Sequence, residues 1–70
     1  MDTLDRILNL IKEKGVSDLE FTRAIGATDR NLVRYWEKKA TKSYMKYIPQ
    51  IARYFNVSTD YLHGLKDERN

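Results

Sequence analysis

The chain has 70 residues, a formal charge of +3 at pH 7 and 41% apolar residues, too many for an obligately disordered protein. It contains no cysteine, which excludes disulfide bonds and thiolate metal sites. No apolar run is longer than two residues, so we predict a single cytoplasmic domain with no signal peptide and no membrane span.

Helical periodicity begins near the first residue. Four apolar residues are spaced at i, i+3, i+4 and i+7, which places them on one face of a helix: Leu4, Ile7, Leu8 and Ile11. Thr3 is positioned to cap this helix, and Gly15 follows the lysines of its last turn. The pattern predicts a first helix over residues 3–14.

The next segment has the form of two short helices joined by a tight turn. Ser17 precedes Glu20 by three residues, the spacing of a capping box, and predicts a second helix over 18–25. Gly26 takes a left-handed conformation without steric cost. Thr28 is the expected cap of a third helix over 29–39, which has no glycine to end it. This arrangement is typical of a helix-turn-helix.

The positive charge is concentrated in this third helix and the residues after it. Between residues 30 and 46, only Glu37 opposes six basic side chains, so the segment carries +5: Arg30, Arg34, Lys38, Lys39, Lys42 and Lys46. The other 53 residues carry −2. Arg30, Arg34 and Lys38 fall at i, i+4 and i+8, one stripe of the expected helix. A basic strip of this kind favours a polyanionic partner.

Two further helices are predicted in the C-terminal half. An apolar stripe from Ile48 to Phe55 contains Pro49, which is tolerated only in a first turn, so the fourth helix is expected over 46–55. Asn56 is a left-handed stop, and Ser58 begins a short fifth helix over 59–63.

The pattern as a whole predicts an all-α bundle of five short helices in residues 1–65, followed by a polar, frayed tail over 66–70. Partial burial is expected at Leu4, Ile11 and Leu62, with Trp36 as the core anchor of the third helix. We expect nine buried side chains: Leu8, Phe21, Ile25, Leu32, Tyr35, Ile48, Ile51, Ala52 and Phe55.

The segment from Phe55 to Gly64 resembles the closing motif of the phage repressor and Cro-type helix-turn-helix domains, which ends in Val-Ser, any residue, Asp-Tyr-Leu and Gly. Residues 14–17 are similar to the first-loop motif of that family, and residues 25–28 to its Leu-Gly-Val-Ser turn. Leu32, Arg34 and Tyr35 match its Ile-x-Arg-Tyr pattern. The resemblance covers residues 4–65 and implies a lambda-repressor-like fold that binds operator DNA as a dimer.

The resemblance also implies roles for individual residues. The third helix would lie in the major groove and contact bases through Asp29, Arg30, Val33 and Arg34. Phosphate contacts are expected at Ser17, Arg23, Asn31, Lys38, Lys39 and Lys42. The expected dimer interface consists of Val57, Tyr61 and Leu65. The implied protein is a prokaryotic or phage-derived regulator of transcription, expected to be a repressor that binds a pseudo-palindromic operator as a homodimer.

Other functions are less well supported by the residues. The single histidine, His63, has no partner pattern for catalysis, and the acidic residues lack metal-ligand spacing, so we predict neither an enzyme nor a cofactor or metal site. Tyr44, Tyr47 and Tyr54 could stack on single-stranded bases, but Tyr47 and Tyr54 are also spaced for packing. A protein-interaction module such as an antitoxin component, and binding of the basic strip to a membrane surface, remain open alternatives.

Overall fold

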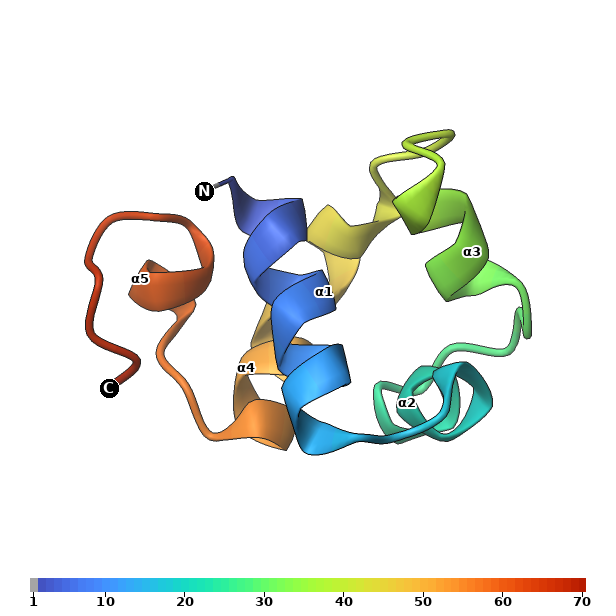
Figure 1. The fold of residues 1–70 in the computed structure, drawn as a ribbon, viewed down its shortest axis with the longest axis horizontal. Helices are drawn as coiled ribbons and strands as arrows, with labels where there is room; N and C mark the ends of the chain where they lie inside the picture. The colour runs from blue at the N-terminus through green and yellow to red at the C-terminus, as the bar shows by residue number, and fades with distance from the viewer. Residues whose placement is uncertain (1) are drawn as a thin grey trace.

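Residues 2–70, which the computed structural model describes, form five α-helices and one 3-10 helix and contain no strand. In chain order these are α1 (Thr3–Lys14), α2 (Asp18–Ala24), α3 (Leu32–Glu37), η1 (Ser43–Tyr47), α4 (Ile48–Phe55) and α5 (Thr59–Leu62). In Figure 1, α1 and α4 occupy the middle of the molecule, α2 and α3 one end, and α5 with both chain ends the other. The prediction of an all-α protein with five helices is confirmed.

Polar side chains begin three of the helices. Ser17 accepts a hydrogen bond from the backbone N–H of Glu20, and Ser58 accepts one from that of Tyr61, as predicted. At α1 the cap is Asp2 rather than Thr3, because its carboxylate accepts the backbone N–H of Asp5 at 2.8 Å. Two helices end at predicted left-handed residues, with φ of 74° at Gly15 and 57° at Asn56.

The predicted third helix, over 29–39, is wrong at both ends. The carboxylate of Asp29 accepts the backbone N–H of Asn31 at 2.9 Å, and this local bond competes with helix formation before Leu32. Thr28 is therefore not the cap. At the other end Lys39 takes a left-handed conformation with φ of 57°, and its N–H bonds the Trp36 carbonyl at 2.9 Å.

The fourth helix begins two residues after residue 46, within the range Met45 to Ile48 in which Pro49 allows a start. Residues 46 and 47 belong to η1, and α4 begins at Ile48 with Pro49 in its first turn. Proline is accepted there because the first N–H groups of a helix have no carbonyl partner. The predicted end at Phe55 is confirmed.

An aromatic cluster joins the helices around Phe21 and Trp36, which have no exposed surface. Their rings lie edge to face with centroids 5.9 Å apart. Tyr54 and Phe55 pack against Phe21, and two tyrosines of η1 pack against Trp36. The predicted role of Trp36 as an anchor, and of Tyr47 and Tyr54 in packing, is confirmed.

Burial differs from prediction at several positions. Tyr35, expected in the core, is 40% exposed. Leu8 and Phe55 are half-buried rather than buried. Three residues for which partial burial was expected lie fully in the core: Leu4, Ile11 and Leu62.

The C-terminal segment, predicted to be frayed, is instead held against α1 and α5. Buried Arg6 donates hydrogen bonds to the carbonyls of Tyr61 and Lys66 at 3.1 and 3.2 Å. Arg69 forms an ion pair with Glu13 at 2.7 Å. The guanidinium groups of Arg6 and Arg69 lie 4.5 and 5.7 Å from the centroid of the Tyr61 ring, which therefore contacts both cations.

Candidate nucleic-acid interface

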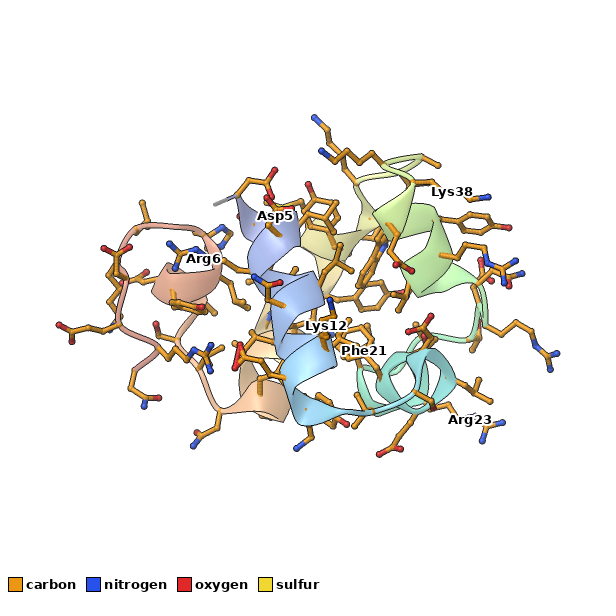
Figure 2. All side chains as sticks on the ribbon, viewed as in Figure 1. Asp5, Arg6, Lys12, Phe21, Arg23 and Lys38 are labelled. Atoms are coloured by element: carbon orange, nitrogen blue, oxygen red, sulfur yellow. The ribbon has the colours of Figure 1, made fainter. Side chains whose placement is uncertain are left out.

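The basic side chains of residues 30–46 all lie on the surface, on α3 and on the segments that precede and follow it. Arg30 lies in the turn before α3, and Arg34 on α3 itself. Lys38 and Lys39 follow the last turn of that helix. Lys42 directly precedes η1, and Lys46 lies within it. All six are exposed. In Figure 2 the side chains of Lys38 and Arg23 project outward from the α2–α3 end of the molecule.

None of these six cations has a carboxylate partner within the described part of the chain. The two ion pairs found among residues 2–70 join Arg6 to Asp67 and Arg69 to Glu13, both on the α5 side. The charge of +5 on residues 30–46 is therefore not neutralised by salt bridges. An uncompensated charge of this size raises the local concentration of anionic partners and speeds their association.

α3 presents its basic residues outward because its apolar residues face the core. Leu32, Val33 and Trp36 are buried, whereas Arg34 lies on the opposite side and is exposed. Lys38, four residues after Arg34, continues the exposed face by one helical turn. The expected base contact at Val33 is corrected here, because that side chain is only 2% exposed and belongs to the core.

Arg30 does not share a helical face with Arg34 as predicted, because α3 begins only at Leu32. Asp29, Arg30 and Asn31 instead form a turn that is held by the hydrogen bond between Asp29 and the N–H of Asn31. The backbone N–H of Leu32 also bonds the Asp29 carbonyl at 3.1 Å. Asp29 therefore orders the entry to α3 with one carboxylate oxygen, and Arg30 extends from this ordered turn.

The loop after α3 is tied back to the core by a contact that the sequence did not reveal. The indole N–H of Trp36 donates a hydrogen bond to the hydroxyl of Ser43 at 2.8 Å. That hydroxyl lies 3.1 Å from the hydroxyl of Thr41. Lys39 and Lys42 thus stand on a short loop with both ends fixed, which reduces the entropy lost when their ammonium groups are ordered by a ligand.

α2 packs against α3. The two helices are in contact and are joined by residues 25–31, with Gly26 left-handed at φ of 83°. Thr22 is buried at this crossing and donates its hydroxyl to the carbonyl of Asp18 at 2.7 Å, so that no polar group is left unpaired.

The expected phosphate-binding residues that precede α3 differ in how exposed they are and in whether their polar atoms are already hydrogen-bonded. Arg23 is exposed in the last turn of α2 and makes no ion pair among residues 2–70. Ser17 is exposed, but its hydroxyl oxygen is already used as the cap of α2. Asn31 is half-buried at the first turn of α3.

One side of α3 is acidic rather than basic. Asp18 and Glu37 line a cleft of about 420 Å³ between α1, α2 and α3, together with Lys12, Val16 and the inner side of Val33. Both carboxylates are exposed. Lys12 offsets one of the two negative charges, so a polyanion would meet a weak net repulsion on this side and attraction on the basic outer face of α3.

The expected dimer residues are only partly available. Tyr61 is 9% exposed, since Arg6 and Arg69 cover its ring, and this corrects its assignment to a free interface. Val57 is half-buried and packs against the core. Leu65 is 74% exposed, which leaves a large apolar side chain free for a partner at the α5 end.

The exposure of Tyr35 on α3 was not expected from the sequence. At about 100° per residue, Tyr35 lies about 60° from Leu32 and at the edge of the apolar face. The angular position of Tyr35 was the available signal, because the buried residues Leu32, Val33 and Trp36 centre the apolar face away from Tyr35.

No protein-family model matches this chain, and neither a curated protein nor a solved structure matches it significantly. Among residues 2–70, no helix has the length and apolar character needed to cross a membrane.

Proposed function

We propose that this protein binds double-stranded DNA with sequence preference and regulates transcription, with α2 and α3 acting as a helix-turn-helix. The observation that supports this most strongly is the set of six exposed, unpaired cations on α3 and the segments that flank it. A short helix with a basic outer face, supported from behind by a second helix, fits the width of the major groove.

Base recognition in this proposal depends on two arginines. Arg34 extends from the outer face of α3, and Arg30 from the ordered turn before it. Each guanidinium can donate two hydrogen bonds to O6 and N7 of a guanine. Asp29, with one oxygen bonded to a backbone N–H, orients the turn and retains one oxygen that could accept from cytosine.

Phosphate binding is assigned to the residues at the ends of these helices. Lys38, Lys39 and Lys42 lie beyond the C-terminal end of α3, where the sugar–phosphate chain would pass. Arg23 and the first turn of α3 at Asn31 would contact the backbone near the other end of the helix. These contacts supply affinity but no base preference.

We further propose a homodimer on a pseudo-palindromic site, joined at the α5 end through Leu65. The molecule measures 30 Å along its longest axis, with α3 and α5 at opposite ends (Figure 1). If two protomers joined at their α5 ends with their longest axes in one line, their α3 helices would lie further apart than the 34–36 Å between successive major grooves. The proposed dimer therefore has its long axes inclined to each other.

The test is selection of bound sequences from random duplexes, followed by titration of the selected and the random DNA at two salt concentrations. The proposal expects a two-fold symmetric consensus and tighter binding to it than to random duplex. Equal binding to both duplexes, or no binding to either, would reject it. A partner protein that binds with unchanged affinity after Arg34→Ala would favour the antitoxin interpretation instead.

A further inference from the structure

Tyr35 differs from every other aromatic residue in the described chain. The seven others each have a ring or cation–π contact within the molecule, and Tyr35 has none. Its hydroxyl also makes no hydrogen bond within residues 2–70. A side chain that is 40% exposed and has an unpaired phenol is suited to binding a partner, because its ring supplies contact area and its hydroxyl a donor.

The position of Tyr35 on α3 restricts what that partner can be. Arg34 precedes it, and Lys38 and Lys39 follow it by three and four residues, so three exposed cations are its near neighbours in the chain. At about 100° per residue, Tyr35 lies about 100° around the helix from Arg34, on the flank rather than on the outermost face. Glu37 lies on the opposite flank, beside the cleft that it shares with Asp18.

We propose that the hydroxyl of Tyr35 donates a hydrogen bond to a phosphate oxygen of the groove wall and thereby seats α3 against one DNA strand. A residue on the flank of a helix in the major groove meets the sugar–phosphate chain, whereas one on the outermost face meets base edges. The acidic flank at Glu37 then stays away from the other strand, which avoids repulsion between carboxylate and phosphate. This inference rests on the proposed function and makes Tyr35 a positioning residue of the same surface.

The decisive variant is Tyr35→Phe, which removes the hydroxyl and keeps the ring. Because this hydroxyl bonds nothing within residues 2–70, the variant should melt at the same temperature as the unaltered protein. Its binding to selected and random duplexes should weaken by the same factor, about threefold to tenfold for each half-site. The slope of log affinity against log salt should stay unchanged, because a neutral donor releases no counterion.

Two further variants serve as controls. Tyr54→Phe removes a hydroxyl from a ring on α4 that packs on Phe21 and lies beneath Lys14, outside the basic segment 30–46, and should leave binding unchanged. Lys38→Ala should weaken binding and also reduce the salt slope by about one unit for each phosphate that the lysine neutralises. The contrast between a reduced and an unchanged slope separates a charged phosphate contact from a neutral one.

Several outcomes would overturn the inference. If Tyr35→Phe binds like the unaltered protein, the hydroxyl makes no contact with DNA. If it changes the preferred base at one position, Tyr35 recognises a base and not the backbone. If the variant melts at a lower temperature, its effect on binding is structural. Failure of the unaltered protein to prefer any duplex would reject the proposed function itself, and is recognised before any variant is measured.

Discussion

Replacing Lys39 with glycine separates backbone strain from charge at the end of α3. Lys39 has φ of 57°, and its conformation lets the N–H groups of Lys39 and Ala40 bond the last carbonyls of α3 at 2.9 and 3.0 Å. A residue with a side chain costs about 1–2 kcal/mol in this left-handed region. Glycine avoids that cost but loses about 0.5–1 kcal/mol through its greater freedom in the unfolded chain. The midpoints of these two ranges differ by about 0.75 kcal/mol, so we predict a gain of about this size in the free energy of unfolding.

Thermal unfolding measures this gain as a rise of about 2–8 °C in Tm for a domain of this size. The same substitution removes a cation, so the salt slope of DNA binding should fall by about one unit for each phosphate that Lys39 neutralises. Lys39→Ala is the matched control, since it removes the same charge and keeps the Cβ atom. It should weaken DNA binding equally without raising Tm. If the glycine and alanine variants melt together, Lys39 is not held in the left-handed conformation, and α3 does not end in the way described above.

Three other predictions concern the surface and the C-terminal segment. Arg34→Ala should cost about 1–3 kcal/mol of DNA-binding free energy and relax the preference at one base pair per half-site, whereas Lys42→Ala should weaken binding to all duplexes alike. If Arg34→Ala weakens binding to the selected and the random duplex equally, Arg34 does not contact a base. Arg6→Ala should destabilise the protein by about 1–3 kcal/mol in urea unfolding, because the carbonyls of Tyr61 and Lys66 lose their hydrogen bonds from the guanidinium. Asp67→Ala, at a fully exposed residue, should cost much less; similar costs for the two variants would argue against the Arg6 hydrogen bonds as the source of stability. The hydrogen bond from Arg69 lowers the pKa of the Glu13 carboxyl below its ordinary 4.5. The ion pair therefore contributes stability above pH 4.5, and this contribution is lost as the pH falls through the lowered pKa. Glu13→Gln should remove this part of the pH dependence of the free energy of unfolding, and an unchanged pH profile would exclude the ion pair.

Most helix boundaries could be predicted because the interactions that set them lie within a few residues of the chain. Ser17 and Ser58 bond N–H groups three residues away, and Gly15 and Asn56 accept a left-handed backbone more readily than most residues. The boundaries of α3 are also local, but two local signals competed there. The carboxylate of Asp29 bonds a nearby N–H at the start of the helix, and Lys39 turns left-handed without being glycine.

The basic character of the candidate site could likewise be predicted, because long charged side chains are rarely buried and the six cations are concentrated in 17 residues. Their relative placement could not. Arg30 lies off the helix that carries Arg34, and the loop bearing Lys42 is held by a bond between Trp36 and Ser43. That bond depends on the direction of an indole N–H, which follows from how the ring packs.

The sequence by itself therefore determined the helical class, the caps of α2 and α5, and the location of the positive charge. Only the tertiary structure decided which residues at the edges of each apolar face are covered. On α3, Trp36 packs on Phe21 and bonds Ser43, so Tyr35 is left exposed and Val33 enters the core. At the other end, Arg6 bonds the carbonyl of Lys66, 60 residues away, and holds a C-terminal segment that has no local structure-forming signal. Periodicity defines an apolar face only to within about one residue, and contacts between distant segments decide the rest.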